Sequence, residues 1–330
     1  MPEISIIIPT WNSAAVIRTC LEHLTQQTFQ DFEVVIVDNA SSDGSVKNLK
    51  EKWSTLIIQI EHLEVNKGFA ASNNIGAHLA RGPWLALLNA DAFPAPDWLE
   101  KLLQAAEKNP SCSSFSSRQI QANARDLLDG AGDAYHITGL AWRRYYNKPV
   151  HKYGLDFKDV FSACPAAALY SREAFLQGGG FDEDYFSYFE DVDLGFRLRL
   201  NGKKCLYVPE AVVHHVGSAS TGKRSDFSVY HGYRNMIWTF VKNMPSPLIW
   251  IFLPLHVAAI LFFAFYLTVR GQGRAIWKAI FDALVGLPKM IEKRKVIQKN
   301  KRIRSVDLLN VMSTGLLEPF QEFRQRNRQL

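Results

Sequence analysis

The chain has 330 residues, of which 47% are hydrophobic and 21% are charged. This composition excludes a disordered chain, a collagen-like repeat and a small disulfide-stapled domain, and the length suffices for one large core or two smaller ones. The formal charge of +6 is unevenly placed. Residues 270–330 carry 14 Lys and Arg against 5 Asp and Glu, a balance of +9, whereas residues 1–269 carry 24 against 27, a balance of −3. The positive charge therefore belongs to the C-terminal segment.

The cysteines and the N-terminus both indicate a reducing, cytoplasmic setting. Four cysteines are scattered singly, without the C-x-x-C pair of a zinc or redox site, which is typical of buried thiols. The chain opens on an apolar strand pattern at residues 4–8 and lacks the basic and apolar regions of a secretory signal peptide. We expect the first domain to face the cytoplasm.

The first hundred residues alternate between strand and helix patterns. Strands are predicted at residues 4–8, 33–38, 57–63 and 84–88, and helices at 14–26, 46–52, 70–80 and 97–107. This rhythm predicts an α/β fold with a mostly parallel sheet covered on both faces. Ligands of such sheets bind beyond the carboxyl ends of the strands, so the segments that follow the strands are the candidate site.

Polar residues follow the first two strands. Pro9, Thr10 and Asn12 come after the first, and the earliest glycine in the chain is Gly44, which excludes a Rossmann fingerprint and a P-loop. The second strand ends at Asp38, before a run of small polar residues. Its carboxylate can accept hydrogen bonds from a base or ribose, or can simply close an Asx turn.

The next two strands also end in polar residues. Asn66 and Gly68 open a helix whose N-terminus can face phosphates. Asn89 and Asp91 lie on one side of an extended segment, where an amide oxygen and a carboxylate can approach one hard cation. An ordinary loop or helix cap remains an alternative for this pair.

A later helix pattern begins with two carboxylates. Glu190 and Asp191 follow a cluster of aromatic residues, and an acidic first turn is also what the helix dipole favours. A carboxylate beside aromatic surface is partly desolvated, which suits a general base. A further strand ends at His214 and His215, which point to opposite faces, so one of them can join Asp91 at a metal.

The motifs and their order resemble the family 2 glycosyltransferases, which have a GT-A-type fold, and within them the bacterial rhamnosyltransferase-like branch. The resemblance spans residues 4 to about 240. Its matching segments are residues 6–12 (IIIPTWN), 37–44 (VDNASSDG), 66–69 (NKGF), 88–91 (LNAD), 179–183 (GGFDE) and 190–194 (EDVDL).

This resemblance implies a catalytic domain at residues 1–240, with a nucleotide-binding half at about 1–105 and an acceptor and catalytic half at about 106–240. It implies transfer of a sugar, with inversion, from a dTDP- or UDP-linked donor to an acceptor hydroxyl. The branch suggests rhamnose as the sugar. The implied nucleotide-binding residues are Pro9, Thr10, Asn12, Asp38, Asn66, Gly68 and Asn89.

The resemblance also assigns the chemistry. Asp191 matches the catalytic base, with Glu190 beside it, and Asp91 matches a ligand of a divalent cation, Mn or Mg. His214 matches a further metal ligand, and His215 is the alternative. Asn89 stands where the family's motif often has its first Asp, which leaves one fewer carboxylate for the metal.

Residues 241–330 are expected to associate with a membrane. Residues 248–269 form a 22-residue stretch without Asp, Glu, Lys or Arg, long enough to span a bilayer, although a buried core helix remains an alternative. The basic tail should stay cytoplasmic, which disfavours a single span and favours a monotopic arrangement or a hairpin returning through 275–291. That second segment is predicted to be an interfacial helix, and the basic residues 289–304 would face anionic lipid unless they form a solvated charged helix.

The sequence therefore predicts an enzyme at the cytoplasmic face of the inner membrane, acting on a lipid-linked saccharide in cell-surface polysaccharide synthesis. The alternative is a non-catalytic module that holds a nucleotide sugar or a lipid. A nucleic-acid partner is disfavoured because the half that faces the nucleotide is net acidic. The oligomeric state is left open.

Overall fold

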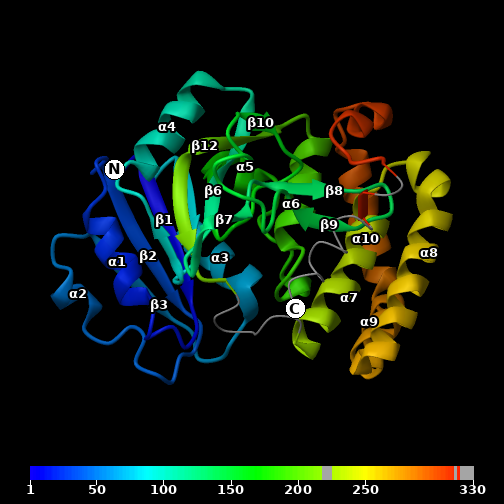
Figure 1. Cartoon of the computed structure of the whole chain (residues 1–330), viewed down its shortest axis with the longest axis horizontal. Coiled ribbons are helices and arrows are strands. Elements are labelled where there is room, and N and C mark those ends of the chain that lie inside the picture. The colour runs from blue at the N-terminus through cyan, green and yellow to red at the C-terminus, as the bar shows by residue number, and fades with distance from the viewer. Residues whose placement is uncertain (218–224, 316–317, 320–330) are drawn as a thin grey trace.

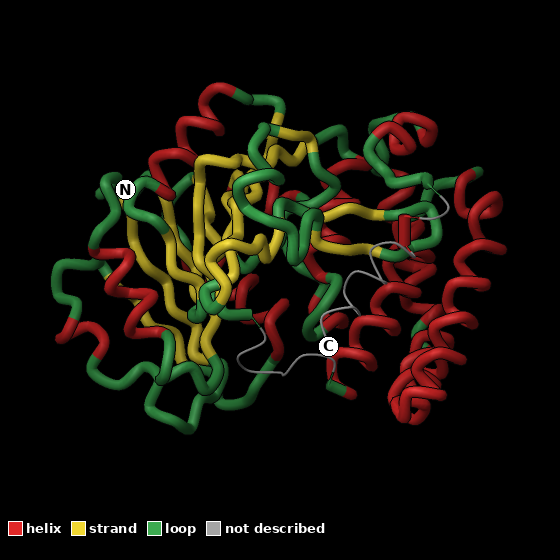
Figure 2. Tube along the Cα trace, in the orientation of Figure 1, coloured by secondary structure: helices red, strands yellow, loops and turns green. Residues whose placement is uncertain are grey.

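The computed structural model describes residues 1–217, 225–315 and 318–319. Within these residues a ten-stranded mixed sheet lies between layers of helices, and a helical bundle packs beside it (Figures 1 and 2). The strands are β1 (Ile4–Thr10), β2 (Phe32–Asp38), β3 (Ile58–His62), β4 (Trp84–Leu88), β5 (Ala92–Pro94), β6 (Cys112–Gln121), β7 (Ala124–Gly130), β8 (Asp133–Tyr135), β9 (Ala141–Arg143), β10 (Lys158–Asp159), β11 (Ala167–Ser171) and β12 (Lys204–His215). The helices are α1 (Ile17–Thr25), α2 (Leu49–Lys52), α3 (Gly68–Leu79), α4 (Trp98–Lys108), α5 (Arg172–Gln177), α6 (Glu190–Leu200), α7 (Asp226–Asn243), α8 (Leu248–Leu267), α9 (Gly273–Val285) and α10 (Leu287–Lys299).

The N-terminal half of the sheet is parallel, as the sequence predicts. β1 lies between β2 and β4, and β2 pairs with β3, all in parallel register. The apolar run of β1 is buried on both faces, which parallel sheets require. Helices α1, α2 and α4 pack on one face, and α3, α5 and α6 pack on the other.

The second half of the sheet is mixed. β11 lies antiparallel between β4 and β6, and the long strands β6 and β12 pair in parallel. The short strand β5 pairs antiparallel with β12, with His215 opposite Ala92. This register brings the end of β12 to the segment that follows β4, although about 120 residues separate the two in the sequence.

Helices α7 to α10 form the bundle, and the expected domain boundary at residue 240 falls inside α7. The predicted helix at 275–291 is two helices, because the chain turns at Gly286. A Cβ atom at Gly286 would lie 2.6 Å from the ring of Trp238, so only glycine permits this approach.

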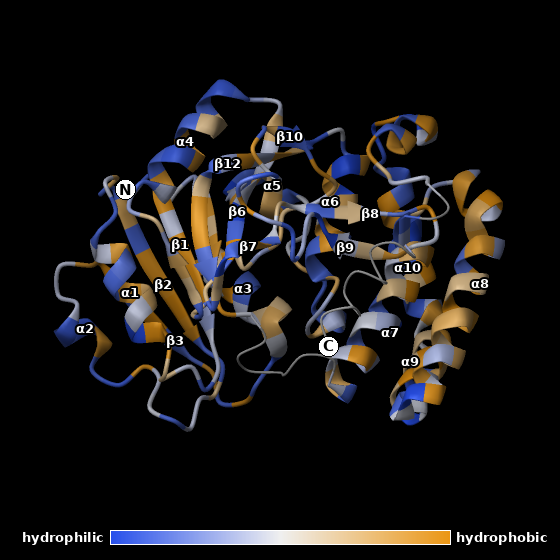
Figure 3. Ribbon diagram, in the orientation of Figure 1, coloured by the Kyte–Doolittle hydropathy of each residue, from blue (hydrophilic) through white to orange (hydrophobic). Residues whose placement is uncertain are grey.

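Helix α8 is apolar on all sides and lies at the outer edge of the bundle (Figure 3). One stripe along its length faces the protein and includes Ile249, His256, Phe263 and Leu267. His256 stacks on Phe240 with ring centroids 4.0 Å apart. By length and composition, the described segment Leu248–Val285 is sufficient to cross a membrane.

Candidate active site

Two adjoining cavities open at the carboxyl ends of the parallel strands. The first has a volume of about 610 Å³ and the second about 480 Å³. Phe69, Asn89, Asp91 and Ser187 line both, so the cavities meet at the end of β4. After the binding roles expected from the sequence, we call the first the donor cavity and the second the acceptor cavity. This edge of the sheet is where the sequence places the site.

The donor cavity gathers six of the seven residues predicted to bind the nucleotide: Pro9, Thr10, Asn12, Asn66, Gly68 and Asn89. The hydroxyl of Thr10 and the side-chain oxygen of Asn89 are buried and have no hydrogen-bond partner within the described residues. Unpaired polar atoms beside a cavity are available to a ligand. Trp11 and Phe227 add aromatic surface to the same cavity.

Asp38, the seventh predicted residue, does not line either cavity. Its Oδ1 accepts a hydrogen bond from the backbone N–H of Ser41 at 3.1 Å, so its side chain closes an Asx turn. The next residue, Asn39, faces the donor cavity. Its Nδ2 donates to Oδ1 of Asn66 at 2.7 Å, and its Oδ1 accepts from the N–H of Lys67 at 2.8 Å. Asn39 therefore shapes the cavity wall, whereas the carboxylate of Asp38 contacts Ser41 and His62.

Gly68 joins the donor cavity to the loop that precedes α6. Its φ is +85°, and a Cβ atom there would lie 2.5 Å from the carbonyl oxygen of Phe186. The same oxygen accepts a hydrogen bond from the N–H of Ala70 at 3.1 Å. Glycine is required by both the backbone angle and the close contact.

The histidine beside Asp91 is His215. Nε2 of His215 lies 3.3 Å from Oδ1 of Asp91, and Nδ1 lies 2.8 Å from Oδ2 of Asp129. His214 lies outside both cavities because neighbouring residues of β12 point to opposite faces of the sheet. The structure thus places His215, the alternative in the sequence analysis, beside Asp91, and not the preferred His214. Burial, together with the charges of Arg125 and His23, lowers the pKa of His214.

The charges around His215 oppose the effect of burial on the pKa of its ring. Burial disfavours the charged ring, but the hydrogen bond to Asp129 and the charge of Asp91 raise the pKa of His215 to about 9. Burial likewise disfavours the ionised carboxylate of Asp91, and the contact with His215 lowers the pKa of Asp91. A positive charge is strongly favoured at this point of the cavity.

The residues present fit a divalent cation. Nε2 of His215 and Oδ1 of Asn89 are both buried and lack a hydrogen bond of good geometry within the part of the chain described. Together with the carboxylate of Asp91 they offer nitrogen and oxygen donors. In the described ranges no group of three or more His, Cys, Asp and Glu side chains is arranged to hold a metal. A cation here would take its remaining ligands from water and substrate phosphates.

Glu190 and Asp191 begin α6 and line the acceptor cavity. Burial, reinforced by the charge of Asp191, raises the pKa of Glu190 well above its ordinary value. Burial also raises the pKa of Asp191, while the N–H of Val192 and the charge of Arg143 hold it down. Desolvation in this cavity therefore moves both carboxyl groups in the direction that a general base at neutral pH requires.

The loop before α6 is held in an unusual backbone conformation. Phe186, Tyr188 and Phe189 have φ values of 64°, 69° and 69°, which cost non-glycine residues on the order of 1–3 kcal/mol each. Nδ2 of the buried Asn235 lies within 3.0 Å of the carbonyl oxygens of Tyr185, Ser187 and Tyr188. Helix α7 thus fixes the loop that positions Asp191.

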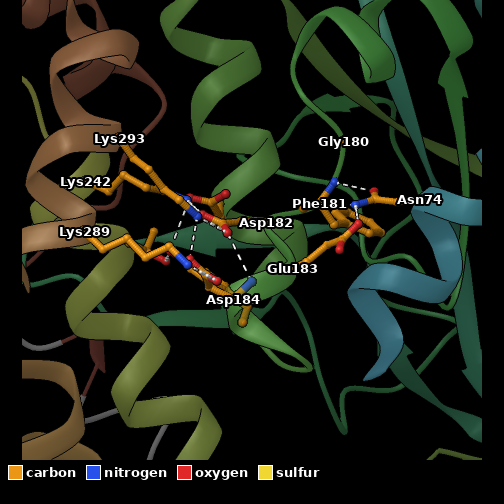
Figure 4. Close-up of polar contacts among 12 residues, drawn as sticks. Asn74, Gly180, Phe181, Asp182, Glu183, Asp184, Lys242, Lys289 and Lys293 are labelled. Atoms are coloured by element: carbon orange, nitrogen blue, oxygen red, sulfur yellow. Dashed lines mark hydrogen bonds and ion pairs between the residues drawn. The ribbon is translucent and has the colours of Figure 1, made fainter. Parts of the chain in front are cut away.

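Lysines of α7 and α10 hold the acidic turn at residues 182–185 (Figure 4). Lys242 lies 2.5 Å from Asp182 and 2.7 Å from Asp193 of α6. Lys289 lies 2.6 Å from Asp184, and Lys293 pairs with both carboxylates of the turn. Lys289 and Lys293, two of the basic residues expected to face lipid, therefore pair with carboxylates of the turn at residues 182–185. Part of the expected basic tail, residues 320–330, lies outside the described residues.

Some residues of the site carry no signal in the sequence. Asp129 and Arg143 line the acceptor cavity and form an ion pair, but neither belongs to a recognisable motif. Phe227 reaches the donor cavity from the start of α7. Asn39 does carry a signal in the sequence, because it directly follows the end of a strand, as Asn89 does.

Sequence comparison finds known proteins that are similar to this chain. A protein from Haemophilus influenzae named as an uncharacterized glycosyltransferase is 41% identical over 108 residues, which cover 33% of this chain and 36% of that protein. The N-acetylglucosaminyl-diphospho-decaprenol L-rhamnosyltransferase of Mycobacterium tuberculosis is 27% identical over 237 residues, 66% of this chain and 77% of that enzyme. This chain thus spans about a third of the first relative's length.

A solved structure supports the fold. The crystal structure of GalNAc-T7 with UDP, GalNAc and Mn²⁺ matches with a TM-score of 0.60 at 18% identity, over 73% of this chain and 48% of that chain. This likeness confirms the α/β, GT-A-type fold. The sequence model of Glycosyl transferase family 2 matches residues 5–179, more than half of the chain. The chain therefore belongs to glycosyltransferase family 2.

Proposed function

We propose that this protein transfers a sugar from a nucleoside-diphosphate donor to an acceptor hydroxyl, with inversion at the anomeric carbon. The observation that carries the proposal is the pair of joined cavities, with Asp91 where they meet and Asp191 in the second. A donor in the first cavity would place its diphosphate near Asp91. An acceptor in the second would place its hydroxyl near Asp191.

Each group has one task in this scheme. Thr10, Asn39 and Asn66 bind or shape the nucleotide pocket, and Asp191 takes the proton of the attacking hydroxyl. Asp91 and His215, with Asn89 beside them, would hold the divalent cation, and the imidazole nitrogen favours Mn²⁺ over Mg²⁺. A cation bound there would neutralise the charge that develops on the departing diphosphate.

The substrates follow from two lines of support. The mycobacterial relative is named as a rhamnosyltransferase acting on a decaprenol-linked sugar, which supports rhamnose as the donor sugar and a lipid-linked saccharide as the acceptor. The exposed apolar surface of α8 and α9 supports work at a lipid surface in polysaccharide synthesis. Its exposed large apolar side chains include Trp250, Ile251, Leu261, Phe262, Phe265, Trp277, Phe281 and Leu284.

We further propose that α8 lies in the plane of the membrane, on the cytoplasmic side. Its buried stripe contacts the protein from Ile249 to Leu267, and Nδ1 of His256 lies 2.7 Å from the carbonyl oxygen of Thr138. A perpendicular span would remove these contacts or bring the charged residues of α7 into hydrocarbon, which is costly. A monotopic arrangement keeps the contacts and buries the exposed face in lipid.

The decisive experiment replaces Asp191 with Asn in the full-length protein. Transfer from a panel of dTDP- and UDP-sugars to a polyprenol-linked acceptor is measured together with nucleotide binding. We expect kcat to fall about 10²- to 10⁴-fold, the usual contribution of a general base, while nucleotide affinity is unchanged. Asp126→Asn, at an exposed carboxylate outside both cavities, is the control.

Retained turnover in Asp191→Asn would contradict the base assignment. A wild type that binds nucleotide sugars without transfer or hydrolysis would favour the non-catalytic module.

A further inference from the structure

We propose that Asp129 is a positioning residue that orients His215 toward Asp91 and engages the guanidinium of Arg143, which lines the same cavity as the proposed base. This inference rests on the proposed function, because it assigns a role within the same site. Asp129 stands near the end of β7 and lines the acceptor cavity. It belongs to none of the motifs that identify the family.

One carboxylate oxygen of Asp129 serves two partners. Oδ2 accepts a hydrogen bond from Nδ1–H of His215 at 2.8 Å, and it also accepts from the guanidinium of Arg143. The side chains of His215 and Asp129 are 3% and 8% exposed. A charge-assisted pair buried to this extent restricts both partners to one geometry.

The first consequence concerns His215. A hydrogen bond from Nδ1–H leaves the lone pair of the neutral ring on Nε2, the nitrogen that lies 3.3 Å from Oδ1 of Asp91. Carboxylates that accept from the far nitrogen of a metal-binding histidine fix its tautomer and its orientation. Asp129 therefore prepares Nε2 to bind a cation jointly with Asp91.

The second consequence concerns Arg143. This residue comes from β9 and lines the same cavity as Asp191, whose carboxylate feels its positive charge. The guanidinium of Arg143 forms an ion pair with Asp129 of β7. In an Asp129 variant the guanidinium would lose this partner, and its charge would act more strongly on Asp191, which would make that carboxylate a weaker base. Asp129 thus connects the metal side of the site to the base side.

The experiment measures Mn²⁺ affinity, which does not depend on turnover. Mn²⁺ is titrated into full-length wild type, Asp129→Asn and Asp129→Ala, alone and with UDP or dTDP, and free Mn²⁺ is followed by electron paramagnetic resonance. We expect about 10- to 100-fold weaker Mn²⁺ binding in the Asp129 variants, the usual loss when such a supporting carboxylate is removed. Nucleotide binding without metal should be unchanged, which also shows that the donor cavity is folded.

Asp126→Asn is the matched control, because Asp126 lies on the same strand and is exposed. It should bind Mn²⁺ as the wild type does. Equal Mn²⁺ affinity in wild type and both Asp129 variants would overturn the inference and leave the proposed function standing. A wild type that binds no Mn²⁺ with either nucleotide would overturn the metal site of the proposed function and this inference together.

Discussion

At the scale of single residues, the acceptor cavity gives two neighbouring carboxyl groups, those of Glu190 and Asp191, different environments. Glu190 is fully enclosed, and one of its oxygens has no hydrogen-bond partner among the described residues. Asp191 is half-buried and accepts a hydrogen bond from the N–H of Val192 at 2.8 Å. The more exposed and better solvated carboxylate is the one that an acceptor can reach, which supports Asp191 over Glu190 as the base.

The pH dependence of transfer tests this assignment. A base acts when deprotonated, and burial raises the pKa of Asp191 above its ordinary value of 3.8. Activity should therefore fall on acidification at a pH above that of an exposed aspartate. The charge of Asp193 raises the pKa of Asp191 and that of Arg143 lowers it, while Asp191 in turn raises the pKa of Glu190. The acid limb of the profile is therefore a property of these interacting groups together. The measurement is kcat/KM against pH at saturating Mn²⁺, and an acid limb at or below 3.8 would contradict the expectation.

Gly68 allows a test of the contact between the donor cavity and the loop that precedes α6. Gly68→Ala combines an unfavourable φ of +85° with a clash against Phe186, whereas Gly44→Ala has a similar φ of +77° and no atom within 4 Å. The φ penalty is roughly 1–2 kcal/mol for either variant. We expect Gly68→Ala to lower the melting temperature more than Gly44→Ala and to weaken UDP or dTDP binding. Equal effects of the two substitutions would show that the contact with Phe186 is unimportant.

At the scale of elements, α10 is tied to the catalytic half and is not a detachable anchor. Lys289 and Lys293 pair with the turn at residues 182–185, and Arg294 donates to the carbonyl oxygen of Val241 at 2.8 Å, near the end of α7. Cations at the C-terminal end of a helix also interact favourably with its dipole. The turn, α6, α7 and α10 therefore form one unit around the loop that precedes Asp191.

Removing one carboxylate of this unit should destabilise the protein. In Asp182→Asn the buried Lys242, 1% exposed, keeps only Asp193. We expect a loss of about 3 kcal/mol, the lower end of the range for a broken buried pair. Glu292→Gln breaks an exposed pair with Lys295 on α10 and should cost less than about 1 kcal/mol. Chemical denaturation at neutral pH measures both, and similar losses would contradict a buried network.

The ion pairs of Asp182 with Lys242 and Lys293 also predict a pH dependence of stability. Although burial opposes ionisation, Lys242 and Lys293 hold the pKa of Asp182 below its ordinary value of 3.8. A lowered pKa in the folded state gives stability that is complete above the unfolded pKa and is lost as pH falls below it. The difference in melting temperature between wild type and Asp182→Asn should therefore shrink below about pH 4. A difference that stays constant on acidification would argue against this ion pair.

At the scale of the whole molecule, more than half of the exposed large apolar side chains among the described residues lie within 248–285, on α8, α9 and the turn between them, away from α1 and α2 (Figures 1 and 3). Replacing Trp250 and Phe265, which are 70% and 72% exposed, with Asp should weaken binding to phosphatidylglycerol-containing vesicles at least tenfold. Each large apolar side chain contributes roughly 1.5–3 kcal/mol when it leaves water. Vesicle co-sedimentation measures the binding of each variant to these vesicles. Ile57→Asp, at a residue 63% exposed in the nucleotide-binding half, should bind as the wild type does.

The sequence by itself determined the features that are local. The alternation of apolar strands with amphipathic helices predicts the parallel half of the sheet, and the structure confirms it, because strand and helix periodicities fix which residues share a face. The polar residues at strand ends include most of those that line the donor cavity, and the acidic helix start contains Asp191. The roles of these residues stay predictions. The apolar stretch at 248–269 likewise predicts α8.

Only the tertiary structure decided which distant groups meet. The pairing of β5 with β12 selects His215 over His214, since their register fixes which histidine points to Asp91. The strand order also brings Asp129 of β7 to His215, and α10 brings Lys293 to Asp182. These pairs join residues 86 and 111 positions apart, where no short-range pattern constrains which charge finds which partner. Their geometry is set by the packing of elements that are distant in the sequence.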